Sequence, residues 1–284
     1  MYNVATKHLR HLGIALLTSA PVILNSCGNG DTQKAQALLS EARSAYENKD
    51  YETSLLLIDS IKNAFPREFD IRKEAIHLST LSTEGLTIRQ LETADSITAV
   101  LNALGDSLQR GIKFVSNPIE GYYVTKSVNP TSFIGSTGIQ ARMTPNGDFY
   151  IMSSLKAKPI KSTSVTVSAN GKEARSATVS HDGERNDRSM GSEIITFMGV
   201  ECDTIGKFIY ENVNSPITLT FNGTGSYSRQ LSSKEAEEIA TLYEYATTIR
   251  KFKLASLEKE RLTRALDLAR SQAARTYVVK DSIK

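Results

Sequence analysis

The chain has 284 residues, a formal net charge of +3 and an isoelectric point near 8.7. A nucleic-acid-binding protein concentrates its basic residues on one face or in one tract, and this sequence has no such tract, so we do not expect nucleic acid as a partner. The length suffices for one large domain or two small ones, each with a real core. The two cysteines are Cys27 and Cys202.

Residues 12–27, LGIALLTSAPVILNSC, form an apolar run that follows the basic residues Lys7 and Arg10. The run has the length of a signal peptide and is shorter than the roughly 20 residues that a membrane-spanning helix needs. We therefore expect residues 1–26 to be removed, which lowers the net charge from +3 to +1 because Lys7 and Arg10 leave with them. The alternatives are an ordinary secretory signal with an incidental cysteine, or a buried core helix.

The end of this run, Leu24-Asn25-Ser26-Cys27, resembles the lipobox of bacterial lipoproteins, and Gly28 follows it. The resemblance implies transfer of a diacylglyceryl group to the Cys27 sulfur, cleavage before Cys27, and acylation of the new terminus with a chain such as palmitate. Two acyl signals are enough for stable membrane anchoring. Cys202 would then have no disulfide partner, so the exported protein would rely on packing for its stability.

The sequence around the anchor also favours one location. Gly28 is not the aspartate that directs inner-membrane retention in bacteria with that sorting rule, so we expect the outer membrane. Among residues 28–40 only Asp31 is acidic, whereas Bacteroidota use an acidic cluster for surface export, so the periplasmic face is favoured over the surface. The inner membrane and the cell surface stay open as alternatives.

Residues 33–66 predict a helical hairpin, because apolar residues recur at three- and four-residue spacing on both sides of Asn48-Lys49-Asp50. The stretch ALLSEARSAYENKDYETSLLLIDSIKNAFP resembles a single tetratricopeptide repeat. The matching positions are Leu38, Ala42, Tyr51, Ser54, Ile58 and Pro66. Repeat units of this kind bury their faces against neighbours, so we expect the hairpin to pack on the long helical stretch that comes next in the chain.

Two long helices are predicted on either side of a strand-rich region. Residues 68–111 carry a two-per-heptad apolar pattern, whose members are Ala94, Ile97, Leu101, Leu104 and Leu108. Ser232 and Glu235 form a capping box at the start of the second helix, and Leu231 can act as its staple. We expect the two helices to pair as an antiparallel coiled-coil stalk, each about 60 Å long. Gly85 interrupts the first helix and marks a kink or a join.

The region between the helices predicts eight short strands. They are residues 122–128, 139–143, 149–153, 165–168, 174–179, 194–198, 217–221 and 227–231. Asn146-Gly147 and Asn170-Gly171 each separate two strand patterns and therefore predict hairpins. Residues 204–211 predict a short helical turn. This spacing of strands is typical of an antiparallel sandwich or a small barrel.

The expected fold class is α+β, with an N-terminal helical hairpin and an antiparallel two-helix coiled-coil stalk that flanks an inserted antiparallel β-sandwich or small barrel. The expected divisions are 1–26 (signal peptide), 27–32 (lipidated tether), 33–112 (hairpin and long helix), 113–231 (β domain), 232–276 (long helix) and 277–284 (tail).

Candidate chemistry is sparse. The dense polar segment from His181 to Arg188 offers His181, Asp182 and Asp187 as weak binding candidates, although alternating charges and the absence of a second nearby histidine favour a solvated loop without a metal. Tyr122 and Tyr123 could stack on sugars, but core and edge positions also explain them. Cys202 with His181 as a catalytic pair is less favoured than a buried structural thiol. We expect no cofactor.

The layout as a whole, with IDSI before a proline, ADSI in a long helix and GIQARMTPNGDFYIMSS in the strand region, is similar to that of uncharacterised lipoproteins of Bacteroidota. We therefore expect a non-enzymatic, membrane-anchored envelope lipoprotein that acts as a structural or binding module through its β domain and stalk. Its partner would be another envelope protein or a glycan. The alternative is an envelope hydrolase with its site in the β domain.

Overall fold

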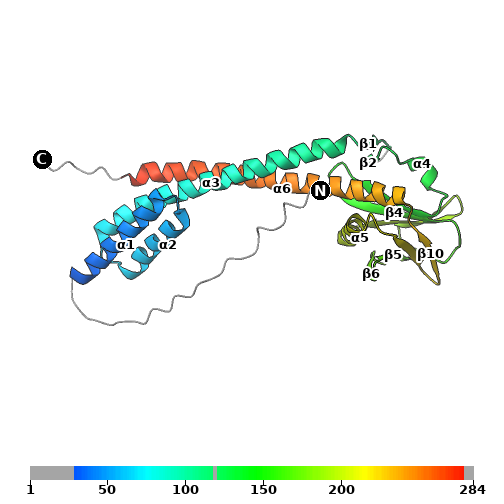
Figure 1. Cartoon of the computed structure of the whole chain (residues 1–284), viewed down its shortest axis with the longest axis horizontal. Helices are drawn as coiled ribbons and strands as arrows, with labels where there is room; N and C mark the ends of the chain where they lie inside the picture. The colour runs from blue at the N-terminus through cyan, green and yellow to red at the C-terminus, as the bar shows by residue number, and fades with distance from the viewer. Residues whose placement is uncertain (1–28, 118–119, 278–284) are drawn as a thin grey trace. The chain divides into compact units, whose positions relative to one another are not determined.

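The computed structural model describes residues 29–117 and 120–277 (Figure 1). Over these residues the protein is α+β, with six helices and two antiparallel sheets. The described residues form two compact units: one extends to Gly85 and also takes in the residues from Ser271 on, and the other runs from Leu86 to Arg270. The expected signal peptide and lipidation site at Cys27 lie outside the described residues. None of the helices within them is both long and apolar enough to cross a membrane.

The first unit is built from α1 (Asn29–Glu47), α2 (Tyr51–Ala64) and the first half of α3 (Phe69–Gln109). A short turn joins α1 to α2: Lys49 has a positive φ of 61°, and the Asp50 side chain caps α2 by accepting a hydrogen bond from the Thr53 backbone N–H at 3.2 Å. Its core is aliphatic and draws on all three helices. The buried residues are Ala35, Leu39, Ala42, Ile58, Ile61, Ile71, Ala75 and Leu78.

Gly85 does not end the long helix, because α3 runs through it. A Cβ atom at this position would lie 2.4 Å from Cζ of Tyr51, which is closer than carbon atoms can approach. The glycine therefore makes room for the tyrosine ring. The join expected at Gly85 is therefore wrong, and the glycine is explained by the packing of α2 against α3.

The second unit contains both sheets. The six-stranded sheet has the order β1 (Ile112–Val115), β2 (Tyr122–Thr125), β3 (Gly138–Met143), β4 (Phe149–Leu155), β8 (Ser192–Met198) and β7 (Asn186–Ser189). The four-stranded sheet has the order β10 (Ser226–Gln230), β9 (Thr218–Asn222), β5 (Ser164–Ala169) and β6 (Lys172–Arg175). The helices of this unit are α4 (Pro130–Phe133), α5 (Val200–Glu211), α6 (Ser233–Thr276) up to Arg270, and the second half of α3.

One core fills the second unit, and α5 contacts strands of both sheets (Figure 1). Gly206 of α5 lets the ring of Tyr243 from α6 and the ring of Phe149 from β4 approach, since a Cβ there would lie 2.5 Å and 2.8 Å from their atoms. The two rings meet edge to face with centroids 5.4 Å apart. Helix α6 contributes Ile239 and Leu242 to the same core. The helices are therefore part of the body that carries the sheets.

Only one of the two predicted Asn-Gly hairpins has positive φ at both turn residues. Asn170 and Gly171 both have positive φ, 53° and 74°, and join β5 to β6 as expected. In the β3–β4 hairpin Gly147 has a φ of 94° whereas Asn146 is not among the residues with positive φ, so that turn is of another type. A third tight turn, between β7 and β8, uses Met190 (φ 50°) and Gly191 (φ 76°).

Three sequence expectations in this unit need correction. The polar segment 181–188 is not wholly a loop, because its last residues pair with β8 as the edge strand β7. Strand β1 was not expected, and β6 covers Lys172–Arg175 rather than 174–179. The helical turn expected at 204–211 is the 12-residue helix α5. Edge strands such as β7 and β6 are polar, so they lack the alternation on which strand prediction depends.

Within the second unit, α3 and α6 run antiparallel. Asp95 of α3 forms an ion pair with Lys259 of α6 at 2.7 Å, and further along α3 Gly105 faces Ile249. Of the expected apolar seam, Ala94 is buried and Leu101 and Leu108 are partly buried. Ile97 and Leu104, in contrast, are 48% and 39% exposed. Three of the five positions of the expected seam are thus buried or partly buried, and two are exposed.

Candidate binding pocket

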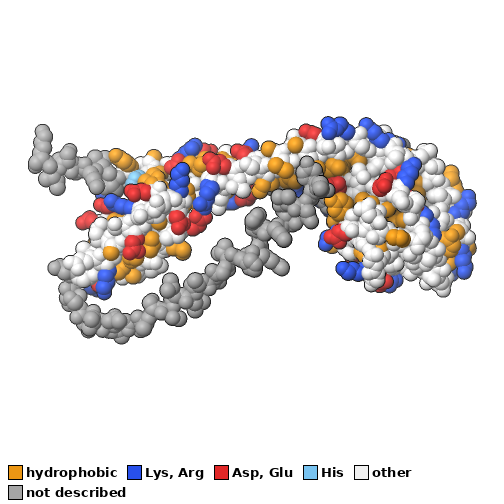
Figure 2. Space-filling view, viewed as in Figure 1, with side chains coloured by type: hydrophobic (Ala, Val, Ile, Leu, Met, Phe, Trp, Pro, Cys, Tyr) orange, Lys and Arg blue, Asp and Glu red, His pale blue; other side chains and the backbone are white. Residues whose placement is uncertain are grey.

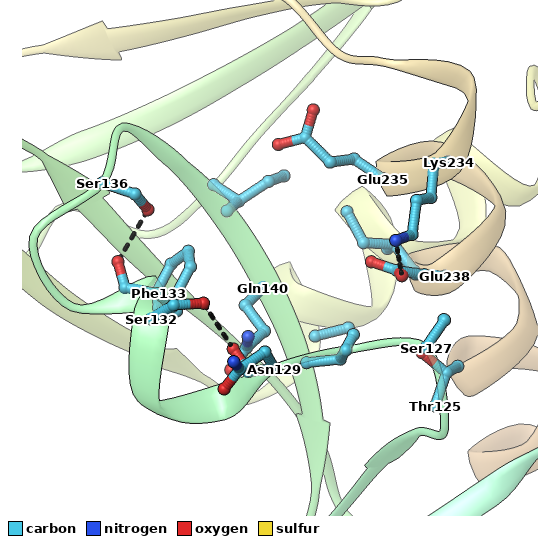
Figure 3. Close-up of a pocket in the computed structure, with 14 residues that line it drawn as sticks. Thr125, Ser127, Asn129, Ser132, Phe133, Ser136, Gln140, Lys234, Glu235 and Glu238 are labelled. Carbon is cyan, nitrogen blue, oxygen red and sulfur yellow. Dashed lines mark hydrogen bonds and ion pairs between the residues drawn. The ribbon is translucent and has the colours of Figure 1, made fainter.

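A pocket of about 330 Å³ opens between the 125–136 segment, strand β3 and the first turns of α6 (Figure 3). Its size lies at the lower end of the range, about 300–1,000 Å³, that is typical of small-ligand sites. The lining combines side-chain hydroxyls, amides and charged groups with an apolar floor. The lining residues are Thr125, Ser127, Val128, Asn129, Ser132, Phe133, Ser136, Ile139, Gln140, Ala141, Lys234, Glu235, Glu238 and Ile239.

The short helix α4 shapes one wall of the pocket. Asn129 caps it by accepting hydrogen bonds from the Thr131 backbone N–H at 3.2 Å and the Thr131 hydroxyl at 2.8 Å, and Pro130 occupies the first turn. Phe133 is buried and forms part of the floor. The hydroxyl of Ser154 on β4 donates to the carbonyl of Ser136 at 2.9 Å, which ties the end of this segment to the sheet.

The opposite wall is the N-terminus of α6, where the capping box forms as predicted. The Ser232 hydroxyl accepts from the Glu235 backbone N–H at 3.2 Å, and the Glu235 carboxylate accepts from the Ser232 backbone N–H at 2.9 Å. The same carboxylate is paired with the guanidinium of Arg229. Glu235 lines the pocket, but its charge is already neutralised.

Glu238 differs from Glu235. Its Oε1 atom is buried and accepts no hydrogen bond, and the nearest cation, Nζ of Lys234, is 4.0 Å away. That separation exceeds a hydrogen-bond length. The carboxylate side chain is 18% exposed. Figure 3 shows Glu238 and Lys234 on one helix, across the pocket from Asn129 and Ser132. A buried carboxylate oxygen without a hydrogen-bond donor is costly, and the described residues leave the hydrogen-bonding capacity of this oxygen unmet.

Gln140 of β3 forms part of the base of the pocket. Its side-chain carbonyl accepts a hydrogen bond from Nε of Arg142 at 2.9 Å, and both residues are buried. The guanidinium carbon of Arg142 lies 4.1 Å from the ring centroid of Tyr122. This stacking and hydrogen bonding hold Gln140 in one orientation.

The arrangement suits hydrogen bonding to a small polyhydroxylated ligand. It offers a carboxylate acceptor, an ammonium donor and several hydroxyls and amides, with apolar carbon beneath them. The charged groups that line it all come from the first turns of α6.

The predicted tyrosines lie beside this pocket and do not line it. Tyr122 stacks with Arg142, and the ring of Tyr123 packs against Phe114 with centroids 5.0 Å apart. Both rings are half-buried. Tyr122 therefore acts on the pocket indirectly, through Arg142 and Gln140, and Tyr123 packs against the core of the unit.

The polar candidates His181, Asp182 and Asp187 do not converge on a site. His181 contacts the guanidinium of Arg188 through its ring nitrogens, with the Nε2 distance at 3.0 Å. Asp187 accepts a hydrogen bond from the backbone N–H of Arg188 at 2.7 Å, and Asp182 is exposed. Within residues 29–117 and 120–277, no group of three or more histidine, cysteine or acidic side chains could hold a metal ion.

Cys202 is a buried free thiol on α5. Burial raises the pKa of the thiol to about 12, and the neighbouring carboxylates of Asp203 and Glu201 add to the increase. A nucleophilic cysteine needs the opposite shift, because the thiolate is the reactive form. The predicted structural thiol agrees with this environment.

Sequence reasoning missed the pocket. The dipeptide Asn129-Pro130 is a helix-start signal that would have located α4, and the capping box did locate the start of α6. The start of α4 and the start of α6 face each other across β3. This arrangement depends on the order of the strands in the sheet, and no local sequence pattern predicts it. No family model, curated protein or solved structure matches the chain in comparisons with known proteins.

Proposed function

We propose that the protein is a non-enzymatic envelope lipoprotein, anchored through Cys27, whose β domain binds a polar envelope component in the pocket between α4 and α6. The lipobox-like sequence supports the anchor, and Gly28 with the sparse acidic residues after it supports the periplasmic face of the outer membrane. One observation carries the binding proposal: the buried Oε1 of Glu238 accepts no hydrogen bond, with only the Lys234 ammonium 4.0 Å away, in a pocket ringed by hydroxyl and amide groups.

Among the expected partners, a glycan suits this pocket better than a protein does. The pocket is concave and small, and its polar groups surround an apolar floor that includes Phe133 and Ile239. A sugar presents hydroxyls at its edges and C–H groups on its faces, so it complements such a lining. A protein partner would instead need a broad surface of about 800 Å² on each side.

The hydrolase alternative has less support. Glu235 is held by Arg229 and by its role in the capping box, so it is not available as an acid or a base. Cys202 is buried, and the raised pKa of its thiol disfavours a nucleophilic role. We infer that the pocket retains its ligand without converting it.

The finer architecture is also a proposal. We treat the two sheets as the layers of an open sandwich, filled by α5 and closed by α6, because residues of both sheets and both helices share one core. We likewise treat the antiparallel α3–α6 pair of the second unit as a coiled-coil stalk, on the basis of the contacts at Asp95 and Gly105.

The anchor is tested by replacing the lipidated residue. Cys27→Ala should abolish incorporation of labelled palmitate and move the protein from the membrane fraction to the soluble fraction. Cys202→Ala is the matched control and should remain membrane-bound. Equal partitioning of Cys27→Ala and the unmodified protein into membranes would overturn the lipid anchor.

The pocket is tested by calorimetry with soluble peptidoglycan fragments and with core oligosaccharides of lipopolysaccharide. We expect saturable binding of one set, weakened at least tenfold by Glu238→Gln, since the amide replaces an acceptor by a donor. Glu237→Gln, at the exposed neighbouring residue that does not line this pocket, is the control and should bind normally. Absence of binding to either set, or equal binding by the two variants, would refute the glycan proposal.

A further inference from the structure

A second pocket, of about 290 Å³, lies between α2 and α3 in the first unit, and we call it the α2–α3 pocket. It shares no residue with the pocket at α4 and α6. Its lining combines aliphatic side chains with three charged groups and two hydroxyls. The lining residues are Ile58, Asp59, Lys62, Arg72, Ala75, Ile76, Ser79 and Thr80. Figure 2 shows acidic, basic and hydrophobic side chains together on the surface of this unit.

One part of the lining is aliphatic. Ile58 of α2 and Ala75 of α3 are buried, whereas Ile76 is 52% exposed although it lines the pocket. A ligand that fills the pocket would remove apolar surface of Ile76 from water, which is favourable when the ligand is itself apolar at that point. The lining therefore favours a ligand with an aliphatic group.

Arg72 brings a hydrogen-bond donor without an acceptor to the pocket. Its Nη1 group donates to the carbonyl of Pro66 at 2.8 Å, which restrains the guanidinium. Its Nε atom is buried and has no hydrogen-bond partner among the described residues. A buried N–H group without an acceptor is costly, because it has lost its hydrogen bond to water. An anionic ligand group in the pocket could supply that acceptor.

The other two charged groups of the pocket are also without ion pairs. Asp59 and Lys62 lie on successive turns of α2 and are exposed, and neither forms an ion pair with any described residue. Glu74, in contrast, is paired with Arg43 on α1 and does not line the pocket. The described residues thus leave two cations and one carboxylate of the pocket available to a ligand.

The positive and negative groups are separated along the helices. A short turn joins α2 to α3, so the two helices run antiparallel, and the hydroxyls of Ser54 and Ser82, 2.9 Å apart, fix their register. Eight residues further along α2 is Lys62, and eight residues back along α3 is position 74, so Lys62 is close to the level of Arg72. Asp59 is level with position 77. At 1.5 Å per residue, Asp59 is therefore about 5–8 Å from the two cations along the helix axis.

We propose that the α2–α3 pocket binds an aliphatic α-amino acid such as leucine. The α-carboxylate accepts hydrogen bonds from Arg72 and Lys62, and the α-ammonium pairs with Asp59. The aliphatic side chain covers Ile76. A charge-assisted hydrogen bond spans about 2.8 Å at each end of the ligand, so two opposite charges on one carbon atom fit between groups at this separation. The small volume of the pocket, just below the range of about 300–1,000 Å³ typical of ligand sites, suits so small a molecule.

Ligands with a single charge fit the same lining less well. A simple aliphatic carboxylate would leave Asp59 without a partner and bring a second negative charge close to it. An aliphatic amine would leave the Nε–H group of Arg72 without an acceptor. A zwitterion uses all three charged groups of the pocket.

Isothermal titration calorimetry of the full-length protein with leucine tests the site. We expect saturable binding of one leucine per chain. Three analogues should each bind at least tenfold more weakly: 4-methylpentanoate, which lacks the ammonium, isoamylamine, which lacks the carboxylate, and glycine, which lacks the aliphatic side chain. Absence of saturable binding at millimolar leucine would overturn the proposal, as would binding of 4-methylpentanoate or isoamylamine as tight as that of leucine.

Substitutions of the charged groups locate the binding. Arg72→Gln should weaken leucine binding at least tenfold, and Lys62→Gln and Asp59→Asn at least threefold, because exposed charges contribute less. Lys62 and Asp59 are exposed, so their variants keep the test valid if Arg72→Gln does not fold. Lys73→Gln and Asp70→Asn, at exposed positions of α3 outside the pocket, are the matched controls and should bind leucine normally. Equal binding by the pocket variants and their controls would overturn the assignment.

The result is separable from that for the glycan pocket. Glu238→Gln should leave leucine binding unchanged, and Lys62→Gln should leave glycan binding unchanged, because the two pockets share no residue. Loss of leucine binding in Glu238→Gln would place leucine in the pocket at α6 and overturn the proposed site.

Discussion

The carboxylate of Glu193, on β8 of the six-stranded sheet, accepts a hydrogen bond from the backbone N–H of Ser162 at 2.8 Å, at the start of the four-stranded sheet. It also accepts from the backbone N–H of Lys161 at 2.9 Å and, more weakly, from that of Ile160 at 3.4 Å. Glu193 is only 6% exposed. One buried side chain therefore accepts the backbone hydrogen bonds of the segment that connects the two sheets. Lys161 in this segment has a positive φ of 50°.

Glu193→Gln should destabilise the protein by about 2–3 kcal/mol, because an amide N–H₂ group replaces one acceptor of hydrogen bonds from buried N–H groups. Urea unfolding followed by circular dichroism measures the change. Glu184→Gln, in an exposed loop position, is the control and should change stability by less than about 0.5 kcal/mol. Equal stability of the two variants would mean that water or backbone shifts replace the carboxylate.

Two glycines of the second unit should respond to alanine in opposite directions. At Gly206 a Cβ would lie 2.5 Å from the ring of Tyr243, so Gly206→Ala should cost about 1–3 kcal/mol through overpacking. At Gly105 the nearest atom, Cδ1 of Ile249, is 3.7 Å away, so Gly105→Ala should stabilise by about 0.5–1 kcal/mol through helix propensity. Thermal unfolding of both variants gives the comparison, and a change of the same sign in both would contradict the packing described here.

Ser232→Ala should lower the free energy of unfolding by about 1 kcal/mol, because it removes the side-chain acceptor for the Glu235 N–H at the start of α6. Ser233→Ala changes the next, exposed residue and serves as the control, with an effect below about 0.5 kcal/mol. Chemical denaturation of the two variants measures the difference between their free energies of unfolding. The capping role would be refuted if both substitutions had the same effect.

Cys202 should contribute to an alkaline loss of stability. The pKa of its thiol is about 12 in the folded protein against 9.0 for an ordinary thiol, so the unfolded chain releases this proton first. The contribution is complete below pH 9 and decreases as the pH rises from 9 towards 12. Tyrosines titrate in the same range, so the measurement compares the unmodified protein with Cys202→Ala at each pH.

The difference in unfolding free energy between those two proteins should be about 1 kcal/mol at neutral pH and should shrink above pH 9. The native thiol should also react slowly with iodoacetamide at pH 8 and rapidly in denaturant, since little thiolate forms in the fold. Rapid alkylation of the native protein would show that Cys202 is accessible and that its environment differs from the one described.

Local signals predicted much of the fold. The capping box at Ser232, the Asn170-Gly171 turn and the helical periodicity of residues 33–66 each depend on neighbouring residues alone, so they could be identified from the sequence. The β7–β8 turn was missed because Met190 takes a conformation with positive φ that methionine rarely adopts, at a position where it is 71% exposed. Strand β7 itself, Asn-Asp-Arg-Ser, has no apolar alternation and pairs only as an edge.

The pocket and the inter-sheet crossing could not be predicted, because both depend on contacts between distant segments. Glu193 meets residues about 30 positions earlier, and Glu238 faces Asn129 across β3. In the sequence Glu238 is one of several glutamates in a charged helix. The heptad pattern of α3 correctly predicted a partner helix. The pattern alone does not show how much of the seam that partner buries, and Ile97 and Leu104 remain exposed.

The shared core of the second unit sets the order in which the protein can fold. Ile139 and Ile151 of the six-stranded sheet pack in the same core as Ile239 and Ala246 of α6, about 100 residues later in the chain. Until α6 has formed, the core that it shares with that sheet is incomplete, and closing so long a segment is slow. The same delay leaves the apolar strands open to aggregation, so we expect refolding yield to fall with protein concentration.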